Sequence, residues 1–211
     1  MHRGFEGDCR DIIPTLEDKY DLIVCDGPFG ARMNVDGTGT GEVEGLDWFK
    51  LCLDVLKPTG VICVFVPTHM LVTHHYQDML LYKSLTQVLT WTHNGWNDIE
   101  RNNDTTNPNK KYTNSILVFK PNTPQQMNEY IGHYPIEELK YHPHQKPVGV
   151  YQYLVNEYTD ENSYILDPFA GSGILAKACY NRNYHAIDYS LEPYRRVRQD
   201  IIAEGYPEST N

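Results

Sequence analysis

Residues 167–173 read DPFAGSG, and their types and spacing suit the binding of an anionic or nucleotide ligand. The segment follows the apolar run 164–166 and precedes good helix formers, which predicts a tight turn between a strand and a helix. Gly171 and Gly173 have no Cβ, so they permit positive φ angles and let a ligand approach the backbone closely. The N–H groups at the start of the following helix would attract a carboxylate or a phosphate.

An acidic residue, Asp188, ends the next apolar stretch, 184–187. In nucleotide-binding units, an acidic residue at a strand end after the glycine turn holds the ribose hydroxyls. The glycines do not form the pattern G-x-G-x-x-G, so this spacing alone is equally typical of a purely structural turn.

A second candidate site follows the apolar run 20–25, which reads as a strand buried on both faces. That run ends in Asp26-Gly27-Pro28-Phe29, where the proline and the glycine force a loop. Taken alone, this string is more typical of a turn after a buried strand than of a catalytic site.

Three strings together resemble the S-adenosylmethionine-dependent amino-methyltransferases of DNA. DPFAGSG is similar to their cofactor motif, Asp26–Phe29 resembles their Asp-Pro-Pro-Tyr motif, and HPHQKP at 142–147 resembles their His-Pro-Thr-Gln-Lys-Pro string. The order of the strings is similar to that in the β group of N6-adenine and N4-cytosine enzymes. The resemblance implies S-adenosyl-L-methionine as the cofactor. It also implies these cofactor-binding residues: Asp8, Gln145, Lys146, Asp167, Phe169, Ala170, Gly171, Ser172, Gly173 and Asp188.

The resemblance implies catalytic roles for Asp26, Gly27, Pro28 and Phe29. The exocyclic amine of a base is a poor nucleophile, because its lone pair is delocalised into the ring. The Asp26 carboxylate and the Gly27 carbonyl would accept its two N–H groups and aim the lone pair at the methyl group. Phe29 would stack on a base flipped out of duplex DNA. Gly27 and Phe29 depart from the usual proline and tyrosine, which implies a more mobile loop.

Asp26 at the first motif position favours adenine N6 as the target, by association with the family. The alternatives are cytosine N4, an RNA base, or a non-catalytic cofactor-binding subunit of a methyltransferase complex. Methylation of cytosine C5 needs a cysteine nucleophile from a Pro-Cys pair, and the sequence contains no such pair.

Composition limits the class of protein further. The 211 residues suit one domain, with 40% hydrophobic residues and no run long enough to span a membrane. The N-terminus shows no apolar signal region, which predicts a cytoplasmic protein. The five cysteines are scattered without C-x-x-C, so we expect buried, reduced thiols. Because His69, His74 and His75 also lack further ligands at metal spacing, no metal site is expected. The net charge of −10 disfavours a general nucleic-acid binder, so a DNA contact would need a local basic face. The residues that could line such a face are Lys110, Lys111, Lys140, Lys146, Arg182, Arg195, Arg196 and Arg198.

Seven apolar segments read as strands, and helices are predicted between most of them, one of them over 148–158. The fold class expected is α/β, a doubly wound, mostly parallel seven-stranded sheet of the Rossmann-like methyltransferase type. One methyltransferase domain would span 1–211, with a minimal target-recognition insertion around 94–141. So short an insertion predicts limited sequence specificity, or help from the loops or from a homodimer or a partner subunit. The expected strands lie near these residues: Phe5, Ile23, Ile62, Val88, Leu117, Ile165 and Ala186.

Overall fold

The computed structural model describes residues 1–27, 46–67, 79, 85–94, 112–121, 123–135, 141 and 145–205. Several sequence predictions lie outside these residues. They are Pro28 and Phe29 of the second motif, the three histidines His69, His74 and His75, and residues 142–144 of the HPHQKP string.

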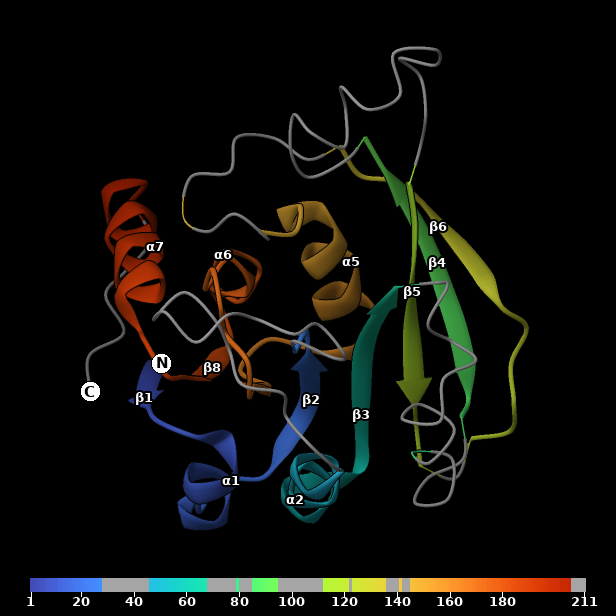
Figure 1. The fold of residues 1–211 in the computed structure, drawn as a ribbon, viewed down its shortest axis with the longest axis horizontal. Coiled ribbons are helices and arrows are strands. Elements are labelled where there is room, and N and C mark those ends of the chain that lie inside the picture. Colours follow the sequence, from blue (N-terminus) through green and yellow to red (C-terminus); the bar gives the residue numbers. More distant parts are fainter. Residues whose placement is uncertain are drawn as a thin grey trace, which may run out of the picture.

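A single mostly parallel sheet forms the centre of the molecule (Figure 1). Its strands lie in the order β1-β8-β7-β2-β3-β5-β4-β6, and only β5 runs antiparallel to both of its neighbours. The strands are β1 (His2–Glu6), β2 (Tyr20–Cys25), β3 (Leu56–Pro67), β4 (Gln87–His93), β5 (Tyr112–Phe119), β6 (Glu129–His133), β7 (Tyr164–Asp167) and β8 (Asn183–Asp188).

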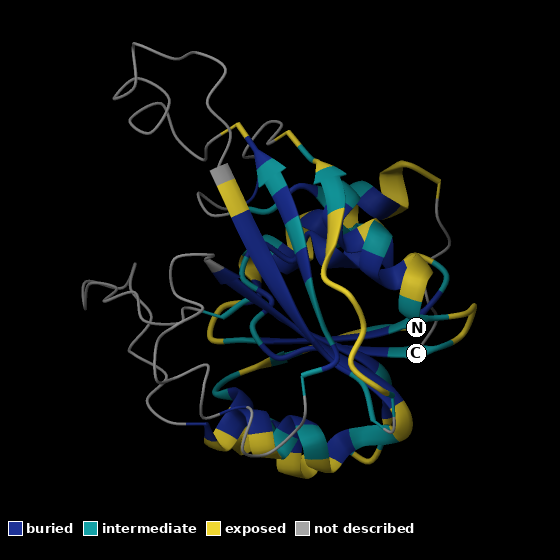
Figure 2. Ribbon diagram, turned by 90° about the vertical axis from the view of Figure 1, so that its right-hand side faces the viewer, coloured by how far each residue is buried: buried dark blue, intermediate teal, exposed yellow. Residues whose placement is uncertain are grey.

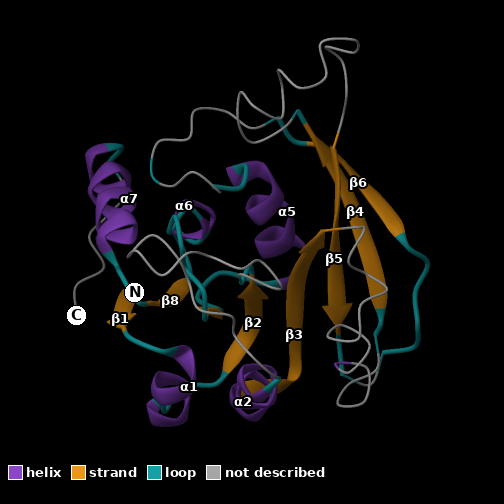
Figure 3. Ribbon diagram, in the orientation of Figure 1, coloured by secondary structure: helices purple, strands orange, loops and turns teal. Residues whose placement is uncertain are grey.

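Helices cover both faces of the sheet (Figures 1 and 3). One apolar cluster joins the sheet to α5 (Val148–Tyr158), α6 (Leu175–Ala178) and α7 (Glu192–Ala203). A second cluster joins the opposite face to α1 (Cys9–Ile12), the 3₁₀ turn η1 (Ile13–Thr15) and α2 (Asp47–Val55). Figure 2 shows the buried strands at the centre and exposed residues on the outer sides of the helices. The predicted α/β doubly wound class is confirmed.

The sheet differs from the prediction in two places. An eighth strand, β6, pairs in parallel with β4, in a segment predicted to be a connection. None of its five residues is buried, so no apolar pattern marks it, and backbone pairing at the sheet edge defines it. The strand expected near Ile62 also begins earlier, because β3 includes residues 57–60. It begins directly after α2, with Leu56 paired to Tyr20 before the register shifts.

The connections after β2 and β7 place the candidate residues at one edge. These two strands are parallel neighbours in the middle of the sheet. The helix after β7, α6, packs on one face of the sheet, whereas the next described helix after β2, α2, packs on the other. Such a reversal opens a crevice beyond the carboxyl ends of the strands, where ligands of doubly wound folds bind. Asp26 and Asp167 lie at these two strand ends.

All five cysteines are free and buried, as predicted. No helix in the described part of the chain is long and apolar enough to cross a membrane.

Candidate active site

The glycine turn is held against the end of β8 by its backbone. The Ala170 N–H donates to the Ile187 carbonyl at 2.9 Å, and the Gly171 N–H donates to Asp188 Oδ2 at 2.7 Å. Gly171 and Gly173 have φ angles of +49° and +70°, in the left-handed region that favours glycine. The predicted turn is therefore present. It leads into α6, a helix of only four residues.

The two glycines differ in what surrounds them. A Cβ at position 173 would lie 2.6 Å from the Tyr194 Cα, so Gly173 lets α7 pack closely against the turn. Among the atoms of the described residues, a Cβ at position 171 would meet only the Phe169 carbonyl oxygen, at 3.8 Å. Gly171 therefore borders open space among the described residues, as a backbone that cradles a ligand requires.

Asp188 is fixed beside that space. Its carboxylate accepts the Gly171 N–H at Oδ2 and the Ser190 N–H at Oδ1, the latter at 3.3 Å. An ionised carboxylate accepts about four hydrogen bonds. Lone pairs therefore remain beyond these two contacts, and the group fits the hydroxyls of a bound ribose.

Other residues of the DPFAGSG string build the turn itself. Asp167 is 5% exposed and accepts the Tyr184 hydroxyl at 2.9 Å and the Phe169 N–H at 3.2 Å. Burial raises the pKa of Asp167 to about 8. The Phe169 ring packs edge-on against Trp48 of α2, and Ser172 Oγ accepts the Ile174 N–H at 3.3 Å.

Asp8 lies near Asp188 because β1 and β8 are paired. Glu6 is in register with Asp188, and the Gly7 N–H donates to the Asp188 carbonyl at 2.9 Å. Asp8 caps α1 and accepts the Arg10 guanidinium and, at 2.7 Å, the Tyr189 hydroxyl. These contacts, that of Arg10 above all, hold the pKa of Asp8 well below its usual range. Its carboxylate therefore orders the loop at the end of β1.

Lys146 and Tyr151 hold the Asp26 carboxylate in place. Lys146 Nζ lies 2.7 Å from its Oδ1 and 2.8 Å from its Oδ2, and the Tyr151 hydroxyl donates to Oδ2 at 3.0 Å. The Asp26 side chain is 20% exposed, so the carboxylate is anchored without being sealed from solvent. Gly27 follows it in the described chain.

The contacts of Lys146 differ from the role that the resemblance implies for this residue. Lys146 was predicted to bind the cofactor, and the structure places its ammonium on Asp26 and 5.7 Å from the centroid of the Phe65 ring. That predicted role stays untested. The sequence reasoning missed Tyr151, because nothing about a tyrosine in the helix at 148–158 indicates that it faces a carboxylate 125 positions away.

Gln145 belongs to a segment tied to α7. Its Oε1 accepts the Tyr141 N–H at 3.2 Å, and the Tyr141 hydroxyl donates to Asp200. These two contacts tie the segment that carries Lys146 to α7. The predicted contact of Gln145 with the cofactor stays untested.

Two of the arginines that could line a local basic face contact other groups of the protein. Arg182 is buried and bonds to Thr159, and Arg195 pairs with Glu6 at 3.0 Å. Lys110, Lys111 and Lys140 fall outside the described ranges.

A doubly wound sheet with a glycine turn, an acidic strand end and a carboxylate at the central crevice is typical of nucleotide-binding α/β proteins. A family model described as DNA methylase, of the N6/N4 type, matches residues 87–197, which is more than half of the chain. The chain belongs to this family, and it is a DNA amino-methyltransferase that uses S-adenosylmethionine. The matched segment contains the glycine turn, Lys146 and Tyr151, whereas Asp26 precedes it.

Individual relatives agree with this assignment. The chain is 26% identical to the type II methyltransferase M.HpaI of Haemophilus parainfluenzae over 93% of its own length and 74% of that protein. Its fold resembles the M1.HpyAVI–SAM complex, with a TM-score of 0.70, 21% identity and coverage of 95% of this chain and 100% of that one. It also resembles the cytosine-N4-specific PvuII DNA methyltransferase, with a TM-score of 0.66, 16% identity and coverage of 100% and 88%.

Proposed function

We propose that the protein methylates adenine N6 in duplex DNA, with the target base flipped out of the helix into the crevice beside Asp26. The observation that carries this proposal is the anchored, partly exposed Asp26 carboxylate at the end of β2. This strand is the direct neighbour of β7, which leads into the glycine turn. S-adenosylmethionine supplies the methyl group when it is bound.

The protein's own groups would activate the amine by orientation. Asp26 would accept one N–H of the amine, and the Gly27 carbonyl would accept the other. With both N–H groups held, the nitrogen lone pair is directed out of the base plane, and alignment supplies most of the rate. We keep Pro28 and Phe29 as the predicted support and stacking surface for the base.

The hydrogen bonds that Asp26 accepts from Lys146 and Tyr151 leave room for this role. Asp26 Oδ2 accepts both Lys146 and Tyr151, whereas Oδ1 accepts Lys146 alone. Each carboxylate oxygen offers about two lone pairs. Among the described residues, Oδ1 is therefore the oxygen with capacity for the amine.

Adenine is favoured over cytosine by the aspartate at the first motif position, which is an association with the family. The test is incubation of duplex DNA with S-adenosylmethionine carrying a labelled methyl group, followed by digestion and mass spectrometry of the nucleosides. We expect N6-methyladenine. N4-methylcytosine would move the proposal to cytosine, and label only in RNA would move it to an RNA base.

The matched control is Asp26→Asn, which keeps the shape of the side chain and removes its charge. We expect this variant to bind S-adenosylmethionine as the wild type does and to lose most of its methyl transfer. Wild-type turnover in Asp26→Asn would contradict the amine-positioning role. Cofactor binding without transfer by the wild type would favour the non-catalytic subunit.

We further propose that residues 94–141 form a minimal target-recognition insertion within one domain spanning 1–211. The surface-exposed β6, with Tyr130 58% exposed, lies inside this segment at the edge of the sheet. Because the chain carries a net charge of −10, we expect DNA contacts to be local, with the loops or a second subunit adding to them.

A further inference from the structure

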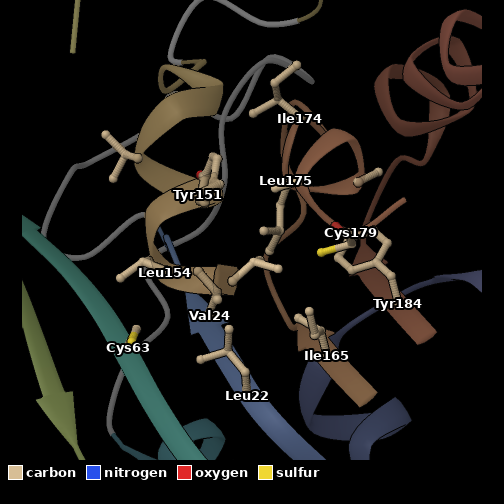
Figure 4. Close-up of a cluster of buried hydrophobic side chains, with 14 of the residues drawn as sticks. Leu22, Val24, Cys63, Tyr151, Leu154, Ile165, Ile174, Leu175, Cys179 and Tyr184 are labelled. Atoms are coloured by element: carbon tan, nitrogen blue, oxygen red, sulfur yellow. The ribbon is translucent and has the colours of Figure 1, made fainter. Parts of the chain in front are cut away.

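We propose that Tyr151 is a positioning residue that orients the Asp26 carboxylate for the target amine. This inference rests on the proposed methyl transfer at Asp26 and adds to it a residue from a different element. Tyr151 lies in the first half of α5, on the side that faces β2 and β3. Figure 4 shows Tyr151 and Leu154 on this helix above Val24 of β2.

The tyrosine ring is held rigidly by the core. Its residue is 5% exposed, and its ring packs against Phe65 of β3 with centroids 5.4 Å apart. A tyrosine side chain has only two rotatable torsions before its hydroxyl, so packing of the ring fixes the position of the oxygen. The hydroxyl donates to Asp26 Oδ2 at 3.0 Å.

The hydroxyl stays a donor throughout the working pH range. Burial, with the negative charge of Asp26 as the next cause, raises the pKa of Tyr151 well above its ordinary value. The phenol therefore keeps its proton next to the carboxylate and offers that oxygen a permanent hydrogen bond.

Lys146 and Tyr151 contribute differently to the carboxylate. The Lys146 ammonium is a compact charge on a flexible stem, and it contacts both oxygens of Asp26 at nearly equal distances. It therefore balances the charge without distinguishing the oxygens. Tyr151 bonds Oδ2 alone, so Tyr151 determines that Oδ1 presents its open lone pair to the base.

The test compares Tyr151→Phe with Tyr153→Phe. Tyr153 lies on the same helix, and its hydroxyl also donates to a carboxylate, Glu129 Oε1 at 3.4 Å, on the exposed side. We expect Tyr151→Phe to lower the single-turnover rate of methyl transfer about tenfold to a hundredfold, the range for losing a hydrogen bond to a charged group. Tyr153→Phe should keep the wild-type rate.

Two further measurements separate positioning from a structural role. The melting temperature and the dissociation constant for S-adenosylmethionine of Tyr151→Phe should stay close to those of the wild type, because the ring and its packing are retained. In an Asp26→Ala background, Tyr151→Phe should cause no further loss, because its partner is already absent. If the Asp26→Ala background has no measurable rate, the test rests on Tyr151→Phe alone. A lower rate of methyl transfer with an unchanged dissociation constant for S-adenosylmethionine would then support the positioning role.

The possible results distinguish the two proposals. A Tyr151→Phe rate within about twofold of an active wild type would overturn the positioning role and leave the proposed function standing. An equal loss from Tyr151→Phe with and without Asp26 would also overturn it. Absence of methyl transfer from the wild type to any DNA would overturn the proposed function, and the positioning role with it.

Discussion

Gly171 and Gly173 form a matched pair whose alanine substitutions should fail in different ways. Both glycines have positive φ angles, so each substitution costs about 1–2 kcal/mol for placing a side chain in the left-handed region. At position 171 the added methyl group meets no atom of the described residues closer than 3.8 Å, so we take this conformational cost as the expected loss of stability.

At position 173 the added methyl group would lie 2.6 Å from the Tyr194 Cα and 3.1 Å from its N. These are backbone atoms, so α7 must move, and overpacking of this kind costs about a further 1–3 kcal/mol. The total of about 2–5 kcal/mol corresponds to a melting temperature roughly 4–20 °C below the wild type. Gly171→Ala should lower it by only about 2–8 °C.

Cofactor binding should show the opposite ranking. The methyl group of Gly171→Ala would occupy the open side of the turn, where we expect the ligand. We therefore expect calorimetry to show at least about a tenfold weaker affinity for S-adenosylmethionine, or about 1.4 kcal/mol. Folded Gly173→Ala should lose less affinity than Gly171→Ala.

Two results would refute this reasoning. Wild-type affinity in Gly171→Ala would mean that the open side of the turn does not face the cofactor. Equal melting temperatures for the two variants would mean that close packing against Tyr194 does not explain Gly173.

Three other predictions concern single residues. Asp188→Ala should weaken S-adenosylmethionine binding by about 1–3 kcal/mol in calorimetry, because bound hydroxyls lose their acceptor, and unchanged affinity would remove that role. Asp167 has a pKa of about 8 in the folded protein against an ordinary 3.8, so its contribution to stability is complete below about pH 4 and is lost as the pH rises towards 8. Urea unfolding should therefore show that, between pH 5 and pH 7, the free energy of unfolding of the wild type falls by up to about 3 kcal/mol relative to that of Asp167→Asn. A difference between the two proteins that does not change with pH would contradict the raised pKa. If greater loop flexibility is the only consequence of Gly27, Gly27→Pro should fold and methylate DNA at least as fast as the wild type, whereas a joint loss of stability and activity would show that proline does not fit.

Local patterns in the sequence were enough for most of the fold. Buried parallel strands are continuous apolar runs, so all seven expected strands appear in the sheet, and the helix predicted at 148–158 has those bounds. The strand β6 was not predicted, because backbone pairing at the sheet edge holds it and none of its side chains is buried. Motifs that combine a strand end with glycine or proline identified the two ends of the crevice, at Asp26 and at the glycine turn.

The sequence alone determined which residue types stand at the ends of β2, β7 and β8, because each follows directly from a short apolar run. Tertiary structure decided which of these groups touch. The Asp26–Tyr151 and Asp26–Lys146 contacts join residues 125 and 120 positions apart, and they depend on how α5 packs across β2 and β3. Gly171 and Gly173 look alike in the sequence, and only the approach of α7 makes one a packing position and leaves the other open to a ligand. Such differences arise from contacts between elements that lie far apart in the sequence. Local propensity and residue spacing carry no information about these contacts.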